Sequence, residues 1–120
     1  MNFRLAGFAQ DQRHRPVALI LAVLFSGISV LSSAEAKSTS HTIDIEAIAF
    51  SPATLEVKSG DTVIWKNKDP FPHNVAAENK GFRSGDIQGG HSWKFKAGKK
   101  GTFSYVCTLH PNMKAVLIVK

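Results

Sequence analysis

The chain is most distinctive in Gly101-Thr-Phe-Ser-Tyr-Val-Cys-Thr-Leu-His-Pro-Asn-Met113, where a strand pattern leads directly into potential metal ligands. A period of two along this stretch places Phe103, Tyr105 and Cys107 on one face of a β-strand. His110 and Met113 follow at C-x2-H-x2-M spacing. We therefore expect a strand that ends at Cys107, and a tight loop that carries His110 and Met113 before the last strand.

Short strand patterns recur on both sides of this stretch, with turn residues between them. Strands are predicted over 42–46, 55–57, 62–66, 92–95, 102–107 and 115–119, with a further short one beside His73. The last of these is apolar at every position, as expected for a strand in the middle of a sheet or covered on both faces. About seven short strands predict an all-β fold, a small antiparallel β-sandwich. Residues 78–91, rich in Gly, Asn and charge, predict an irregular connection with at most one turn of helix.

The first third of the chain has the pattern of an export signal. Three arginines precede an apolar run over residues 17–31, and Ala34-Glu35-Ala36 offers an A-x-A cleavage site. We predict a secretory signal peptide over residues 1–36, one small exported domain over residues 37–120, and a periplasmic location. An uncleaved amino-terminal anchor is the alternative.

Positive charge dominates the predicted domain, with twelve Lys and Arg against seven Asp and Glu. The scattered lysines and the export signal argue against nucleic acid. An acidic redox protein or an anionic membrane surface would be attracted by this charge, and a surface that only keeps the protein soluble is the alternative. Four lysines surround one predicted turn, where they form either a docking patch or a solvated hairpin: Lys94, Lys96, Lys99 and Lys100.

The only cysteine is best explained by a metal. A free thiol is a liability in an oxidising compartment, and the alternatives for Cys107 are an inert buried thiol or an intermolecular disulfide. A thiolate, an imidazole and a thioether favour copper over zinc, and such a site needs one further imidazole, for which His73 is the candidate. The predicted ligands are therefore His73, Cys107, His110 and Met113. His41 and His91 are expected to be solvated or in turns.

These motifs together resemble the cupredoxins, the small blue-copper proteins, of the plastocyanin and amicyanin kind. The resemblance covers most of the predicted domain, from Phe50-Ser-Pro-Ala-Thr-Leu-Glu-Val-Lys-Ser-Gly-Asp-Thr-Val-Ile-Trp65 through Pro72-His73-Asn74-Val75 to the stretch that ends at Met113. It implies a Greek-key cupredoxin fold with one type 1 copper ion at the four predicted ligands. It also implies that Asn74 joins the two ligand segments, with its side chain near Thr108 and its N–H near the Cys107 sulfur.

Two positions depart from the family pattern. Leu109 stands where amicyanin-like proteins carry proline, so its N–H is free and could donate a second hydrogen bond to the thiolate. Ala115 replaces a glycine that is common after the methionine. The resemblance further implies that His110 reaches the surface within an apolar patch formed by Phe71, Pro72, Leu109, Pro111 and Asn112.

The predicted site favours electron transfer over catalysis. Its copper would have no open equatorial position, and the motif contains no acid–base pair, so we expect an electron shuttle and not an enzyme. We also expect the protein to be a monomer. It would act with a redox partner protein that has an acidic docking surface, without stable membrane insertion after cleavage. The alternative is a periplasmic copper carrier or scavenger. A metal-free exported adhesion module would require the ligand spacing to be a coincidence.

Overall fold

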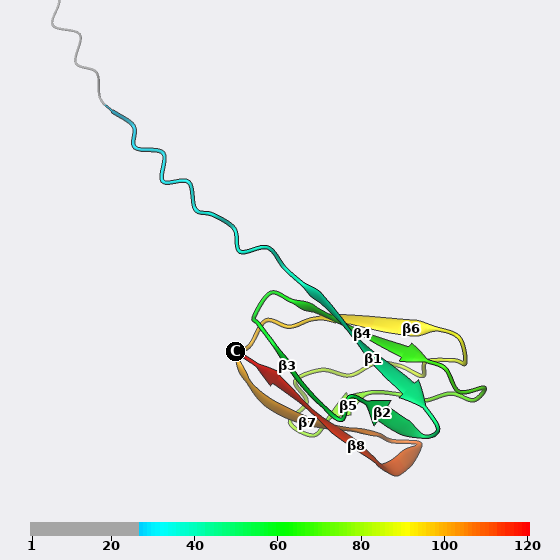
Figure 1. Ribbon diagram of the computed structural model, residues 1–120. Coiled ribbons are helices and arrows are strands. Elements are labelled where there is room, and N and C mark those ends of the chain that lie inside the picture. The colour runs from blue at the N-terminus through cyan, green and yellow to red at the C-terminus, as the bar shows by residue number, and fades with distance from the viewer. Residues whose placement is uncertain (1–26) are drawn as a thin grey trace, which may run out of the picture. The chain divides into compact units, whose positions relative to one another are not determined.

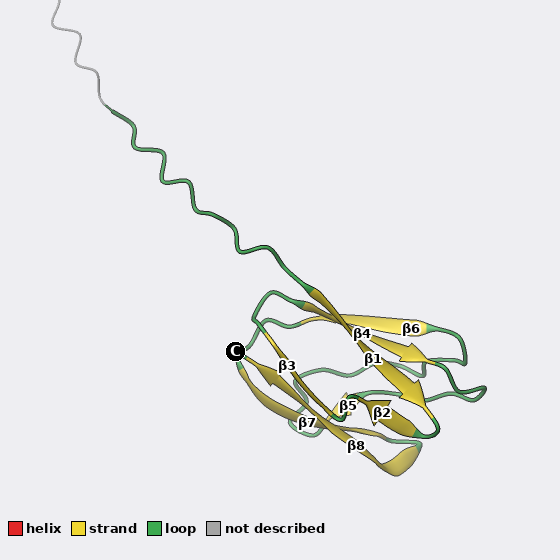
Figure 2. Cartoon of the chain, in the orientation of Figure 1, coloured by secondary structure: helices red, strands yellow, loops and turns green. Residues whose placement is uncertain are grey.

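The computed structural model describes residues 27–120, and these residues form two β-sheets without any helix. Figures 1 and 2 show the two layers facing each other. The first sheet has the strand order β2-β1-β4-β6 and the second has the order β3-β8-β7-β5. The strands are β1 (Ser40–Glu46), β2 (Ala49–Ser51), β3 (Thr54–Val57), β4 (Thr62–Asn67), β5 (Ala76–Ala77), β6 (Ser92–Lys96), β7 (Gly101–Cys107) and β8 (His110–Val119).

The predicted all-β sandwich is confirmed, although the sheets are mixed and the described part of the chain has eight strands. β1 pairs parallel with β4, and β3 pairs parallel with β8. The chain leaves the first sheet after β2, forms β3 in the second sheet and returns as β4 beside β1, so that β4 runs in the same direction as β1. Residues 78–91 form an irregular connection without helix, as expected.

The core lies between the two sheets and is rich in aromatic side chains. Trp65 and Tyr105 are fully buried, and their rings meet edge to face with centroids 5.7 Å apart. Phe82, from the irregular connection, packs against both rings. Such aromatic pairs add to the free energy gained from burial. Trp93 and Phe95 are half-buried at the edge of this cluster.

The β7–β8 hairpin corrects one expectation from the sequence. β8 begins at His110, so His110 and Met113 lie on a strand and not in a loop before it. Only Thr108 and Leu109 form the turn, because the ladder between the strands already resumes with Cys107 opposite His110. β8 lies between β3 and β7, which explains the apolar character of its end.

The sandwich belongs to a compact unit, Ala34–Lys120, that contains all the described strands and the buried core. This unit therefore has what it needs to fold without the residues before it. Most of the predicted signal peptide, residues 1–26, lies outside the described residues, and its cleavage stays a prediction. Nowhere in residues 27–120 is there a helix that could cross a membrane.

Asp61 holds together one end of the sandwich. Its carboxylate accepts hydrogen bonds from the backbone N–H groups of Thr39 (2.9 Å) and Lys58 (3.0 Å), and it lies 2.9 Å from Nε2 of His41. These contacts, led by the bond from Thr39, lower the pKa of Asp61 from 3.8 to about 2. The carboxylate thus joins the start of β1 to the turn before β4.

We predict that Asp61 contributes to the loss of stability in acid. Because its pKa in the folded protein lies below the unfolded value, its contribution is complete above about pH 4 and is lost as the pH falls toward about 2. The stability difference between the wild type and Asp61→Asn should therefore shrink over this range. Urea unfolding midpoints from about pH 6 to about pH 2 measure it. A difference that stays constant with pH would exclude this role.

Candidate metal centre

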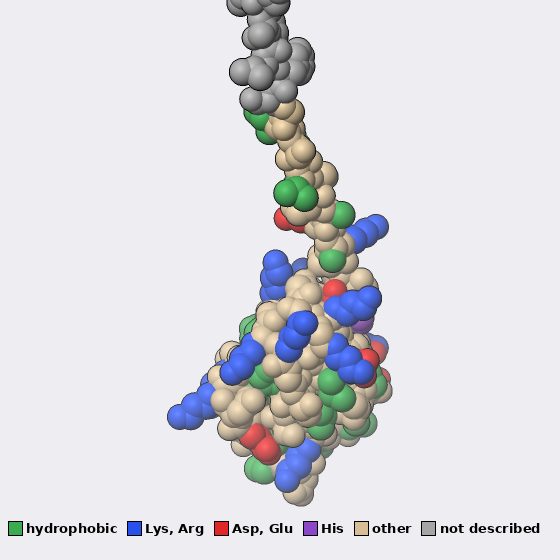
Figure 3. Space-filling model, turned by 90° about the vertical axis from the view of Figure 1, so that its left-hand side faces the viewer, with side chains coloured by type: hydrophobic (Ala, Val, Ile, Leu, Met, Phe, Trp, Pro, Cys, Tyr) green, Lys and Arg blue, Asp and Glu red, His purple; other side chains and the backbone are tan. Residues whose placement is uncertain are grey.

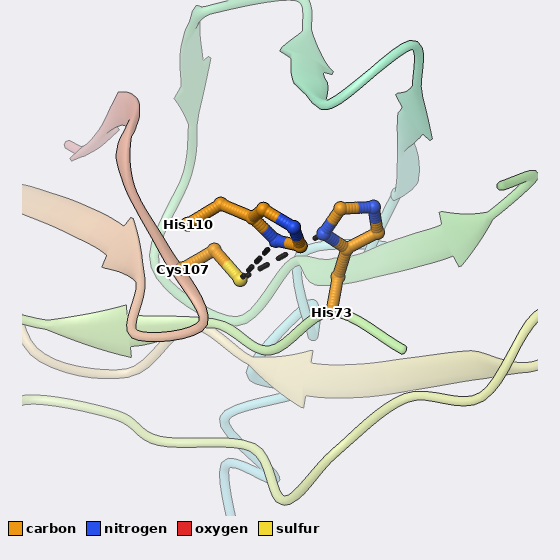
Figure 4. A group of neighbouring side chains, drawn as sticks. All are labelled: His73, Cys107 and His110. Carbon is orange, nitrogen blue, oxygen red and sulfur yellow. Dashed lines mark hydrogen bonds between the residues drawn. The ribbon is translucent and has the colours of Figure 1, made fainter. Parts of the chain in front are cut away.

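Three of the predicted ligands converge at one end of the sandwich. The Nδ1 atoms of His73 and His110 lie 3.7 Å and 3.9 Å from the Cys107 sulfur. The ligand atoms of all three residues lie within 4.8 Å of one another. Figure 4 shows both imidazole rings turned toward the sulfur, with His110 and Cys107 coming from one hairpin and His73 from another segment.

The local backbone explains why these side chains meet. Cys107 is the last residue of β7 and His110 the first of β8, so the two-residue turn places them opposite each other in the ladder. His73 is held on the other side by a bridge to Ile87, in which each residue donates its N–H to the other's carbonyl, at 3.1 Å and 2.7 Å. The site is therefore assembled by the fold from two separate segments.

Met113 completes the predicted set from the same strand as His110. It is buried, with 3% of its surface exposed, and it lines a surface depression together with His110 and Leu109. His73 and Cys107 have no exposed surface, whereas His110 is half-buried. His110 is thus the member of the set that solvent or another molecule can reach.

Asn74 links the two ligand segments, as the family resemblance implies. Its Nδ2 donates to the Thr108 hydroxyl (2.7 Å), and the Thr108 N–H donates back to its Oδ1 (2.9 Å). The Asn74 N–H also approaches the Cys107 sulfur at 3.4 Å. The second hydrogen bond to this sulfur that the sequence suggested, from the Leu109 N–H, is not formed in this structure, which describes both residues.

A buried carboxylate orients the His73 ring. The Asp69 Oδ2 lies 2.8 Å from His73 Nε2, and both side chains are almost fully buried. A carboxylate at this distance favours the tautomer that carries its proton on Nε2, which leaves a lone pair on Nδ1. The Nδ1 atom, which faces the sulfur, is therefore free to bind a metal.

The same carboxylate holds a strained turn. Ala47 and Ile48, between β1 and β2, have positive φ angles of 51° and 57°, which are unfavourable for a β-branched residue such as isoleucine. Their N–H groups donate to Asp69 at 2.8 Å and 3.0 Å. Burial by itself would raise the pKa of Asp69, but the bonds from Ile48, His73 and Ala47 outweigh it and lower the pKa. Asp69 is therefore a carboxylate at neutral pH.

The donor set and its spacing fit a copper ion. With the ligand distances typical of zinc sites, about 2.3 Å to sulfur and about 2.1 Å to nitrogen, a trigonal site for one ion separates the sulfur from each nitrogen by about 3.8 Å. The observed separations of 3.7 Å and 3.9 Å match this value. A thiolate and two imidazoles with a nearby thioether are the ligands of electron-transfer copper sites. His73, Cys107 and His110 thus form a possible copper site, with Met113 as the fourth candidate ligand.

Sequence reasoning missed two residues near the site. The sequence does not indicate a role for Asp69 at the site, because its spacing of four residues from His73 brings two side chains together only in a helix. Ile48 was not expected at the surface beside the ligands, since nothing in its local sequence predicts the left-handed turn. The other two domain histidines are not near the site: His41 contacts Asp61, and His91 is exposed.

Comparisons with known proteins agree with this geometry. The model of the cupredoxin-like domain family matches residues 17–119. An amicyanin from Paracoccus denitrificans is 31% identical over 77% of this chain and 74% of its own length. A chloroplastic plastocyanin from Tetradesmus obliquus is 31% identical over 78% of this chain and 72% of its own. The chain belongs to the cupredoxin-like family.

Solved structures show the same fold. An amicyanin variant in its Cu(I) form superposes with a TM-score of 0.63 and 29% identity, over 68% of this chain and 82% of that one. A copper-containing nitrite reductase from Thermus scotoductus also reaches a TM-score of 0.63, at 25% identity, but the match covers only 22% of that chain. The amicyanin match therefore includes most of both proteins, and the reductase match only a part of the larger one.

We predict that Asp69→Asn raises the reduction potential of the copper-loaded protein by about 50 mV or more, close to a tenfold change in the relative affinity for the two oxidation states. A buried negative charge behind His73 stabilises the more highly charged Cu(II) form, and the substitution removes that charge. In the metal-free protein the same variant should lose about 1–3 kcal/mol of stability, because hydrogen bonds to the β1–β2 turn are weakened. Voltammetry and urea unfolding measure the two effects.

Asp44→Asn is the matched control for this experiment. Asp44 carries the same charge but pairs at the surface with Lys68 (2.8 Å) and has no contact with a ligand. Its removal should leave the potential and the stability nearly unchanged. Equal shifts in both variants would mean that only net charge matters, and the role assigned to Asp69 would be wrong.

Proposed function

We propose that this protein is an exported type 1 copper protein that shuttles one electron between redox partners. His73, Cys107, His110 and Met113 would hold the ion. Bound copper would supply the electron-transfer chemistry by alternating between Cu(I) and Cu(II). The observation that carries the proposal is the convergence of two Nδ1 atoms on the single cysteine sulfur, at distances that fit one ion.

The surroundings of the ligands support transfer of an electron over transfer of the metal. His73 and Cys107 are fully buried, and Asn74 and Asp69 fix their segments by hydrogen bonds. A site held this firmly changes little between oxidation states and does not readily release its ion. No catalytic role is proposed, because the ligand set fills the coordination of the metal and leaves no position for a substrate.

The surface around His110 suits brief docking. Leu109 is 47% exposed and Phe71 is 38% exposed, and Ile48, also 47% exposed, adds a third apolar side chain that the sequence did not indicate. Ile48, Leu109 and His110 line a common depression. A small apolar patch of this kind favours a weak and short-lived complex with a redox protein. Electrons would pass through His110, the exposed ligand. An acidic surface on that partner stays a prediction, as does the monomeric state.

The proposed location is the periplasm, with residues 1–36 as a cleaved signal peptide. Its support is the sequence pattern of charge, apolar run and cleavage site, together with a compact unit that begins at Ala34. Mass spectrometry of the protein exported by a bacterial host would show whether the mature chain begins at Lys37.

The visible and electron paramagnetic resonance spectra of residues 37–120 loaded with Cu(II) test the proposed site. We expect an intense blue thiolate-to-copper band with narrow copper hyperfine splitting, lost in Cys107→Ala and retained in the matched control His91→Ala. A pale protein with ordinary cupric signals would show that the four residues do not bind copper together, and would overturn the proposal.

The rate at which the protein loses copper distinguishes an electron shuttle from a copper carrier. Binding to the folded state alone stabilises a protein by mass action, so copper should raise Tm by about 10 °C or more in a domain of this size. We further predict slow removal of the ion by a chelator in both oxidation states. Rapid exchange of Cu(I), with little change in Tm, would instead support a copper carrier.

A further inference from the structure

Six exposed lysines gather at the end of the sandwich opposite the ligands. We call this set the lysine face: Lys37, Lys58, Lys96, Lys99, Lys100 and Lys120. Figure 3, which views the side of the molecule where the chain ends, shows blue side chains spread over this surface with few red ones between them. The sequence placed four lysines near one turn but did not predict that the other segments add to them.

Hydrogen bonds between the loops prove that these lysines share one surface. The Ser59 N–H donates to the Lys120 carbonyl at 2.8 Å, and the Gly60 N–H donates to the Ala97 carbonyl at 2.6 Å. The Ser59 hydroxyl donates to the Gly98 carbonyl. The turn before β4, the turn before β7 and the end of β8 are therefore joined at this end, and each brings lysines to it.

Little negative charge neutralises the lysine face. Asp61 is buried and already bonded to two backbone N–H groups and His41. Glu56 pairs with Lys120 at 2.9 Å. Glu35 lines the same depression as Lys37 and Lys58, but it would be removed with the predicted signal peptide. Among the described residues, Lys58, Lys96, Lys99 and Lys100 form no ion pair with any carboxylate. The face therefore keeps a strong positive potential that attracts polyanions.

The lysine face is too far from the ligands to serve electron transfer directly. β7 runs from Gly101, beside this face, to Cys107 at the site, and seven residues of strand span about 20 Å. A redox protein bound at the lysine face would thus be held away from His110. This distance favours an occupant other than the electron-transfer partner.

We propose that the lysine face binds an anionic phospholipid surface and holds His110 on the side that faces away from the membrane. Several unpaired lysines on one surface suit a dense layer of phosphate headgroups, because each adds its own attraction near the surface.

The chain also enters the domain at the lysine face, since the Thr62 N–H donates to the Thr39 carbonyl just before β1 begins at Ser40. In the sequence, the apolar run of residues 17–31 precedes this entry point. Membrane contact at the lysine face is therefore compatible with a cleaved or an uncleaved leader.

Vesicle binding by residues 37–120, which include all described strands and the core, tests the proposal. Because the lysine face does not involve the ligands, the metal-free protein should bind as well as the copper-loaded one, and the result is independent of the proposed function. We expect co-sedimentation with phosphatidylglycerol-containing vesicles at low salt, loss of binding as salt is raised, and no binding to pure phosphatidylcholine.

Two double variants, each of which removes two positive charges, test whether the vesicles bind at the lysine face. Lys99→Gln with Lys100→Gln should weaken the partition onto phosphatidylglycerol vesicles by about tenfold or more. The control, Lys66→Gln with Lys114→Gln, removes two exposed lysines outside the lysine face and should weaken it less than about threefold. Equal weakening in both would show that only net charge matters. That result, or no binding to anionic vesicles at low salt, would overturn the proposal.

Amide hydrogen exchange tests the orientation. Vesicles should protect residues 58–60 and 97–100 and leave residues 109–112 unchanged. Protection of residues 109–112 instead would mean that the apolar patch meets the membrane, and the proposed orientation would be wrong.

Discussion

The reciprocal hydrogen bonds between Asn74 and Thr108 are the contact on which the site depends. One side chain both donates to and accepts from the segment that follows Cys107, while the N–H of the same residue reaches the sulfur. The segment of His73 therefore cannot move independently of the β7–β8 hairpin. The rest of the fold serves this alignment, since the aromatic core fixes the two sheets behind it.

Sequence patterns predicted the parts of this structure that depend on local periodicity and on chemically unusual side chains. The period of two that aligns Phe103, Tyr105 and Cys107 predicted the β7 strand, and the spacing of Cys107, His110 and Met113 predicted three of the candidate ligands. The involvement of Asn74 came from family resemblance and not from any physical pattern in the chain. Its geometry could be checked only when both segments were seen together.

Features that depend on contacts between distant segments could not be predicted from the sequence. The parallel pairing of β1 with β4 depends on where β3 crosses to the other sheet. The role of Asp69 depends on a backbone path that brings it to His73 and to the β1–β2 turn at once. The sequence pattern also predicted His110 in a loop. The β7–β8 ladder resumes after only two turn residues, and the point at which it resumes depends on the pairing of the two strands. In each case the information lies in contacts between segments and not within one.

The difference in exposure between the two histidines has a consequence for how the protein acquires its metal. His73, Cys107 and Met113 are buried, so an ion can enter or leave only past the half-buried His110. In the proposed function this is also the route of the electron. A docked partner would therefore act as a lid over the metal, and exchange of the ion would be slowest while the protein is at work.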